Sequence, residues 1–315
     1  MEIVTVQTDV LVIGAGLAGI CAATAAAGEG CRVILTEKTQ VLGGNSGPDA
    51  GVHPSGAHRF HTFAAETGII GQITETAAWR LAKNDSVWHH YNTSPLWDSV
   101  LDSALREAGV TVWRNHFAHE PEMDGSRIAA VRVIDTGAYR ERQVLVKTAV
   151  IDASGDGNIS ALAGAPFVTG RESRGETGER LAPEQPDSDT LGSSVVAMVR
   201  KTNGRVEFIA PPGTPPFHPG YWETAVFKPG ENDTLAYFFP SETGGERDTV
   251  ADEAEIYQKS LAQVYSAWNH IKNISCKEEA KNWELFWIGS RLCKRESRRF
   301  LGDYFLTETD VEAGT

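Results

Sequence analysis

Residues 9–19 read DVLVIGAGLAG, and this stretch decides the fold of the chain around it. The apolar run VLVI is typical of a parallel strand that is buried on both faces. Gly14, Gly16 and Gly19 follow, and they begin a segment rich in alanine, which favours a helix. We therefore predict a strand, a tight turn and a helix in this order.

A second apolar strand is predicted at residues 31–38, CRVILTEK, and it ends at Glu37. An acidic residue about 20 positions beyond the glycines completes the fingerprint of a dinucleotide-binding unit. The first amides of the helix would face a pyrophosphate, and Glu37 would bind the ribose hydroxyls of an adenosine. The fingerprint leaves open whether the dinucleotide is NAD or FAD.

Residues 38–58, KTQVLGGNSGPDAGVHPSGAH, form a connection longer than is usual between a strand and a helix. The backbone amides of Gly43 and Gly44 and the short side chains of Asn45 and Ser46 suit a second contact with a pyrophosphate or a flavin ring. The alternative interpretation is a surface loop without a ligand.

Strands are also predicted at residues 111–115, 128–134 and 143–151, the last two joined by a polar turn around Gly137. A small antiparallel meander is the simplest arrangement of these three segments. The last strand ends in ASGDG at residues 153–157, and small residues at a strand end suit a position beside a cofactor. Helices are predicted between about residues 60 and 108 and over residues 251–274 because apolar residues recur three and four apart.

Four segments together resemble one known family: GAGLAG, LGGN, VIDASGDGNISALAGA at residues 150–165 and RESRRFLGDYFLTETDV at residues 295–311. They resemble FAD-dependent oxidoreductases of the glutathione-reductase type, two-dinucleotide-fold flavoproteins related to the flavoprotein component of heterodisulfide reductase. The resemblance covers nearly the whole chain. It implies an α/β fold, with a Rossmann-like FAD-binding domain that carries a β-meander insertion, and a second α+β substrate domain.

The resemblance also implies the domain limits. Residues 1–170 would form the FAD-binding domain, which is discontinuous, and residues 171–290 the substrate domain. Residues 291–315 would be an arginine-rich segment that returns toward the FAD domain. In the family a final strand and helix follow this segment, whereas the sequence ends in VEAGT. We therefore expect the closing part of the FAD domain to be missing, or to come from a partner chain.

The resemblance implies roles for the residues that match the family's motifs. It places the first glycines on the pyrophosphate and the LGGN loop, residues 42–45, on the flavin side. Glu37 would bind the adenosine ribose, and the strand end DASGDG, residues 152–157, would line the adenine. The predicted cofactor-binding residues are Gly14, Ala15, Gly16, Leu17, Ala18, Gly19, Glu37, Lys38, Gly43, Gly44, Asn45, Ser46, Gly155 and Asp156.

The sequence does not assign a catalytic residue. His53 and His58 lie near the expected flavin ring, where a neutral imidazole would accept a substrate proton; the alternative is a structural role for each. On a helix, Arg295, Arg298 and Arg299 would share one face and hold an anionic substrate, or would form a salt-bridge patch. His53, His58, Arg295 and Arg298 are therefore the catalytic candidates.

Composition excludes several classes of function. The net charge of -13, from 29 Lys+Arg against 42 Asp+Glu, disfavours nucleic acid as a partner. Some relatives carry a 4Fe-4S cluster, but the scattered Cys21, Cys31, Cys276 and Cys293 support neither a cluster nor another metal site. No apolar run reaches the roughly 20 residues that span a bilayer, so we expect a cytoplasmic protein without membrane contact.

The leading hypothesis is an oxidoreductase in which FAD exchanges two electrons, formally a hydride, with a small organic substrate between the domains. One alternative is a truncated or partner-dependent flavoprotein subunit without activity of its own. Another is a nicotinamide enzyme, which leaves the LGGN loop and the DASGDG strand end without an evident role. The sequence identifies neither the substrate nor the electron acceptor.

Overall fold

The computed structural model describes residues 3–52, 67–81, 95–218, 227, 233–237 and 242–313. The chain divides into two compact units. The first unit comprises Met1–Pro48, His53–Val168 and Arg298–Thr315, and the second comprises Asp49–Val52 and Thr169–Ser297. The domain limits at residues 170 and 290 remain a prediction.

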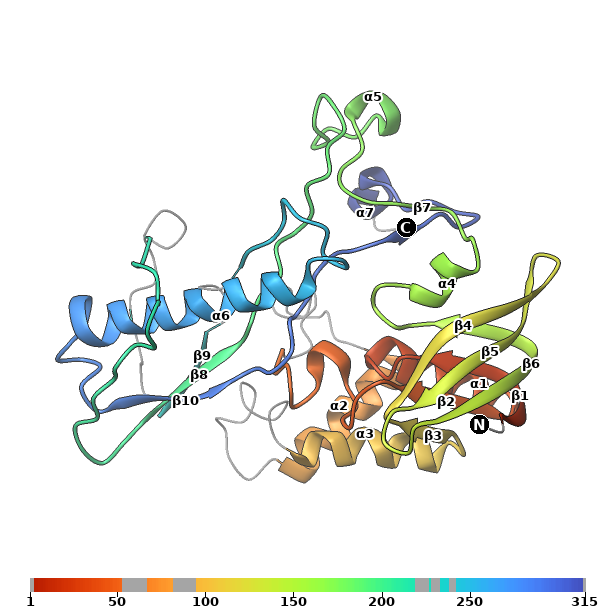
Figure 1. Cartoon of the computed structure of the whole chain (residues 1–315), viewed down its shortest axis with the longest axis horizontal. Coiled ribbons are helices and arrows are strands. Elements are labelled where there is room, and N and C mark those ends of the chain that lie inside the picture. Colours follow the sequence, from red (N-terminus) through yellow and green to blue (C-terminus); the bar gives the residue numbers. More distant parts are fainter. Residues whose placement is uncertain are drawn as a thin grey trace. The chain divides into compact units, whose positions relative to one another are not determined.

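Within the described part of the first unit, six strands form one sheet in the order β3-β2-β1-β6-β5-β4 (Figure 1). Its parallel strands are β3 (Thr111–Arg114), β2 (Val33–Glu37), β1 (Val4–Ile13) and β6 (Arg140–Asp152). This order confirms the predicted Rossmann-like α/β core. Parallel strands end at the same edge, so the glycine turn after β1, Glu37 at the end of β2 and the turn after β6 lie together.

The second half of β1, residues 10–13, is buried on both faces, which is why its sequence VLVI is apolar without interruption. Val10 and Val12 pack in one cluster with residues of three helices, whose bounds are α1 (Leu17–Gly28), α2 (Gly68–Leu81) and α3 (Pro95–Glu107). Leu11 and Ile13 pack on the other face with Val131 and with Ile159 of α4 (Asn158–Leu162). Each such buried aliphatic side chain stabilises the fold by about 1.5–3 kcal/mol.

The antiparallel meander consists of β4 (His116–Asp124), β5 (Arg127–Asp135) and β6. The prediction that residues 111–115 belong to the meander is wrong, because this segment is β3 and pairs in parallel with β2. Asn115, with a φ of 57°, turns the chain from β3 into β4. Sequence reasoning missed β4 because its sequence, HFAHEPEMD, is charged and contains a proline, which weakens a strand pattern.

Short elements complete the first unit. The 3-10 turn η1 (Gly44–Ser46) follows β2, and β7 (Phe167–Val168) pairs with β11 (Arg299–Phe300) in antiparallel orientation. The helix α7 (Glu308–Ala313) follows β11.

The second unit contains an antiparallel sheet in the order β10-β8-β9 and one long helix (Figure 1). Its elements are α5 (Arg174–Thr177), β8 (Ala197–Lys201), β9 (Thr234–Tyr237), α6 (Glu253–His270), the π-helical turn η7 (Ile271–Ser275) and β10 (Trp283–Ile288). The long helix predicted over residues 251–274 is α6 with η7. None of the helices in the described ranges is long and apolar enough to cross a membrane.

Candidate cofactor site

The three glycines of the first turn have different surroundings. A Cβ on Gly14, whose φ is 95°, would lie 2.5 Å from the carbonyl oxygen of Ala153, and one on Gly19 would lie 1.9 Å from the carbonyl oxygen of Gly14. A Cβ on Gly16 would have its nearest neighbour, the Cα of Gly44, at 3.9 Å. Gly14 thus permits the turn, Gly19 permits close packing of helix and strand, and Gly16 leaves room for a ligand.

The N-terminus of α1 lies directly after Gly16. Gly16 is its N-cap, no side chain caps it, and its first turn contains no acidic residue. The first intrahelical hydrogen bond runs from the N–H of Ile20 to the carbonyl of Gly16 at 3.0 Å. The amides of Leu17, Ala18 and Gly19 therefore have no acceptor within the helix, and together with the helix dipole they favour an anion such as a pyrophosphate.

Glu37 is buried at the end of β2, with 4% of its surface exposed. Its Oε2 accepts a hydrogen bond from the N–H of Ala15 at 2.9 Å, and its Oε1 accepts from the N–H and the hydroxyl of Thr39 at 3.0 and 2.9 Å. The carboxylate thus joins the glycine turn to the residues after β2. Lys38, the next residue, is exposed.

The LGGN loop lies against the first glycine turn. The N–H of Gly43 donates to the carbonyl of Ala15 at 2.7 Å, and Gly16 and Gly43 form a parallel bridge. Asn45 is exposed, whereas Ser46 is buried and its hydroxyl has no hydrogen-bond partner among the described residues.

The turn after β6 is organised by Asp152. Its Oδ1 accepts from the hydroxyl of Ser154 at 2.6 Å, and its Oδ2 accepts from the N–H of Ser160 in α4 at 2.8 Å. Of the two predicted adenine contacts in this turn, Gly155 is exposed and has open space at its Cβ position, and Asp156 is buried.

The RESRR segment does not form a helix on which its arginines would share one face: residues 295–298 have no regular structure, and Arg299 begins β11. The side chains of its two candidate arginines bind different acceptors. In the second unit, Arg295 donates to Glu242 at 3.1 Å and to the hydroxyl of Ser194 at 3.2 Å. In the first unit, Arg298 donates to the carbonyl of Asp156 and the Oδ1 of Asn158 at 3.1 and 2.8 Å. The candidates His53 and His58 lie outside the described residues.

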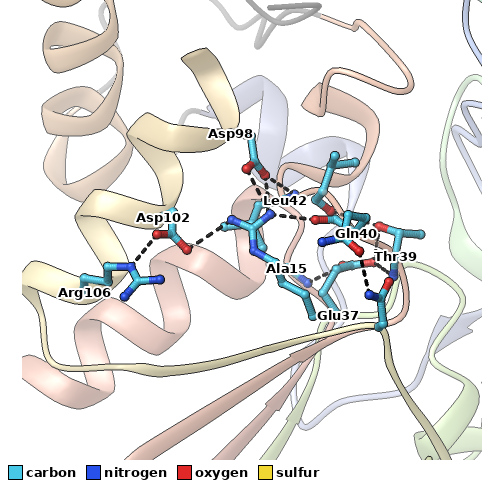
Figure 2. Close-up of polar contacts among 11 residues, drawn as sticks. Ala15, Glu37, Thr39, Gln40, Leu42, Asp98, Asp102 and Arg106 are labelled. Atoms are coloured by element: carbon cyan, nitrogen blue, oxygen red, sulfur yellow. Dashed lines mark hydrogen bonds and ion pairs between the residues drawn. The ribbon is translucent and has the colours of Figure 1, made fainter. Parts of the chain in front are cut away.

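Two residues that sequence reasoning did not select also contact this region. Asp98 of α3 accepts from the N–H of Leu42 at 2.7 Å, and Arg114 of β3 donates to the carbonyl of Gln40 at 2.7 Å (Figure 2). Leu42 and Gln40 both belong to the stem of the LGGN loop. The sequence carried no signal for these contacts, because they join segments more than 50 residues apart in the chain.

Comparison with known proteins identifies the family. A family model described as FAD dependent oxidoreductase matches residues 9–315. The chain belongs to this family. The family implies FAD as the cofactor, as predicted. The glutathione-reductase type and the relation to heterodisulfide reductase remain predictions.

Individual relatives match only part of the chain. The 4-oxocyclohex-2-ene-1-carboxylate 5-dehydrogenase of Sinomonas cyclohexanicum is 34% identical over 142 residues, which are 42% of this chain and 23% of the relative. The chain thus spans less than a quarter of that protein's length.

Among solved structures, that of a myxobacterial chondrochloren halogenase matches over 64% of this chain and 45% of the halogenase chain, with 20% identity and a TM-score of 0.38. A geranylgeranyl bacteriochlorophyll reductase-like protein of Thermoplasma acidophilum matches 64% and 49%, with 16% identity and a TM-score of 0.37.

The residues of this chain fit the dinucleotide part of FAD. The open Cβ position of Gly16 and the uncapped helix N-terminus suit its pyrophosphate. Within the described ranges, no three His, Cys, Asp or Glu side chains are grouped so that they would hold a metal ion.

Proposed function

We propose that this chain binds FAD at the two glycine loops and exchanges two electrons, as a hydride, with a carbon atom of a small organic substrate. When bound, FAD supplies the electron-accepting chemistry. The chain's own residues hold the cofactor: the amides of Leu17 and Ala18 bind the pyrophosphate, Glu37 the adenosine ribose, and the LGGN loop the flavin side.

The observation that carries this proposal is the open approach to the backbone of Gly16 beside an uncapped helix. Described protein atoms fill the Cβ positions of Gly14 and Gly19, whereas among the described residues the Cβ position of Gly16 has only the Cα of Gly44 within 4 Å. Packing therefore accounts for two of the glycines, and a ligand that approaches the backbone accounts for the third.

The substrate class is proposed from the relative that the chain resembles over 142 residues. That relative is named as a dehydrogenase of 4-oxocyclohex-2-ene-1-carboxylate. We propose dehydrogenation of a small cyclic carbonyl compound with a carboxylate as the reaction to test first. Catalytic roles for His53, His58, Arg295 and Arg298, and a cytoplasmic location, remain predictions.

The first test is the absorbance spectrum of the purified chain, with and without added FAD, followed by acid release of the chromophore. Flavin bands with FAD released in about equal amount are expected. Anaerobic addition of 4-oxocyclohex-2-ene-1-carboxylate, and of a panel of cyclic ketones and hydroxy acids, should then bleach the flavin bands with at least one compound. A yellow, folded protein that no compound bleaches would contradict the proposed hydride transfer.

Gly16→Ala tests the binding site itself. Apart from its chain neighbours, the new methyl group has no atom of the described residues nearer than 3.9 Å, so the fold should tolerate it while the methyl occupies the space for the pyrophosphate. The matched control is Gly28→Ala at the end of α1, where a Cβ has open space and no ligand is expected. We expect FAD affinity to fall at least tenfold, or about 1.4 kcal/mol, only in Gly16→Ala. Equal FAD affinity in both variants would place the cofactor elsewhere, and failure of the unaltered chain to bind added FAD would favour the partner-dependent alternative.

A further inference from the structure

The stem of the LGGN loop, residues 39–42, has no regular structure of its own and is held by α3 and by the end of β3 (Figure 2). The N–H of Leu42 donates to Oδ1 of Asp98 at 2.7 Å, and the carbonyl of Gln40 accepts from Arg114 at 2.7 Å. Asn115 adds a bond from its N–H to the carbonyl of Thr39 at 3.1 Å. The backbone that leads into Gly43 is thus fixed from outside the loop.

Asp98 and Arg114 also bind each other. Nη1 of Arg114 lies 2.8 Å from Oδ1 and 2.9 Å from Oδ2 of Asp98, and Nη2 donates to Asp102 at 3.1 Å. About a fifth of each side chain in the Asp98–Arg114 pair is exposed, 20% and 22%. Burial lowers the pKa of Arg114, but its hydrogen bonds to Asp98 and Asp102 outweigh burial and raise the pKa overall, so the guanidinium stays charged.

The helix that carries Asp98 packs into the core of the first unit. Asp98 lies in the first turn of α3, where a carboxylate is favourable to the helix dipole. Its neighbours Trp97 and Leu101 are fully buried in the core cluster that includes Val12 of β1. The position of Leu42 is therefore set relative to the same core that positions the first glycine turn.

We propose that Asp98 and Arg114 are positioning residues for FAD, which act by holding the loop stem so that Gly43 and Gly44 lie against the Gly16 turn. This inference rests on the proposed FAD site. Gly43 and Gly44 have φ values of 108° and 57°. Two adjacent glycines can adopt many backbone conformations when the residues before them lose their hydrogen bonds to Asp98 and Arg114. If the loop is already ordered before FAD binds, the binding free energy is not reduced by the entropy cost of ordering the loop.

The proposal predicts a selective loss of affinity. The first glycine turn and Glu37 would bind the ADP half of FAD, and the LGGN loop the flavin side. Releasing the loop stem should therefore weaken FAD binding much more than ADP binding. A general loss of structure in the first unit would weaken both ligands together.

The experiment measures the Kd of FAD from the quenching of flavin fluorescence, the Kd of ADP by calorimetry, and the thermal unfolding of the apoprotein. The test variants are Asp98→Ala and Arg114→Gln. We expect FAD affinity to fall about tenfold or more and ADP affinity less than about threefold. Asp98→Asn should recover part of the FAD affinity, because its amide oxygen still accepts from the N–H of Leu42.

Arg106→Gln is the matched control. Arg106 belongs to the same network through Asp102, but its side chain is 75% exposed and its bond to Asp102 does not reach the loop stem (Figure 2). Both affinities should remain unchanged in this variant.

Three results would overturn the proposal: unchanged FAD affinity in Asp98→Ala and Arg114→Gln, an equal fall of FAD and ADP affinity, or an equal loss in Arg106→Gln. If Asp98→Ala does not fold, Asp98→Asn and Arg114→Gln decide by the same criteria. Failure of the FAD site itself is recognised separately, because the unaltered chain would then bind no FAD.

Discussion

A Cβ placed on Gly44 would lie 2.9 Å from the Cα of Gly16, so the two glycine loops are in backbone contact. These residues are 28 positions apart in a chain of 315 residues. The contact brings the predicted pyrophosphate turn and the predicted flavin-side loop into one site. Substitution of Gly44 therefore tests whether this contact contributes to FAD binding.

Gly44→Ala should disturb this contact. The φ of 57° at Gly44 costs a residue with a Cβ about 1–2 kcal/mol, and the new methyl group would press on the Gly16 turn. We expect the free energy of unfolding to fall by about that amount and FAD affinity to fall at least about tenfold. Chemical denaturation and flavin fluorescence measure the two effects. Full FAD affinity in this variant would contradict a role for the loop contact in binding.

Glu37→Gln should destabilise the apoprotein as well as weaken FAD binding. Both carboxylate oxygens accept from N–H groups, so one backbone donor, at Ala15 or Thr39, would face the new NH₂ group. A buried donor left without its acceptor costs about 1–3 kcal/mol. Denaturation of the apoprotein measures this cost. Glu29→Gln, at an exposed position after α1, is the control and should leave stability unchanged.

Arg298→Gln should destabilise the turn after β6. Arg298 donates to the carbonyl of Asp156 and to Asn158, and its guanidinium lies 5.4 Å from the ring centre of Phe167. We expect a loss of about 1–2 kcal/mol in unfolding free energy. A double-mutant cycle with Asn158→Ala isolates the side-chain pair, and a coupling energy near zero would mean that the bond to Asn158 contributes nothing.

Asp9 should make stability depend on pH in acid. Its hydrogen bonds with Arg32 lower its pKa from 3.8 to about 2. Because the folded pKa lies below the unfolded one, this contribution is complete above about pH 4 and is lost as the pH falls through 2. The difference in unfolding free energy between the unaltered chain and Asp9→Asn should therefore shrink from pH 5 to pH 2. A constant difference over this range would show that the pair does not titrate as expected.

Lys272 should be essential to the stability of the second unit. It is 5% exposed, and its Nζ donates to the carbonyls of Ala280, Lys281 and Trp283 at 2.5, 3.0 and 2.7 Å. Lys272→Met would leave these carbonyls without their donor, at a cost of about 3 kcal/mol. Lys281→Met, which removes a pair with Glu278 at the surface, is the control and should cost less than about 1 kcal/mol. Equal stability of both variants would refute this role.

Local sequence patterns were sufficient to predict several elements that form the site. The apolar run before Gly14, the alanine-rich helix and the acidic residue at position 37 determined β1, α1 and β2, because each signal lies within one element and its flanking turn. The predicted turn around Gly137 is confirmed for the same reason, since it joins two adjacent strands. Beyond this turn, the sequence predicted the meander but assigned the wrong first strand to it.

The sequence by itself determined the kind of protein: the glycine turn and the acidic residue at the end of β2 specify a dinucleotide unit through local geometry. Only the tertiary structure decided that Gly44 lies on Gly16, that Asp98 and Arg114 hold the loop stem, and that Arg295 and Arg298 bind acceptors in different units instead of sharing a helix face. The physical reason is that hydrogen bonds and packing between distant segments depend on how the strands are ordered in the sheet. That order is a property of the whole fold and leaves no periodic signal in the residues themselves.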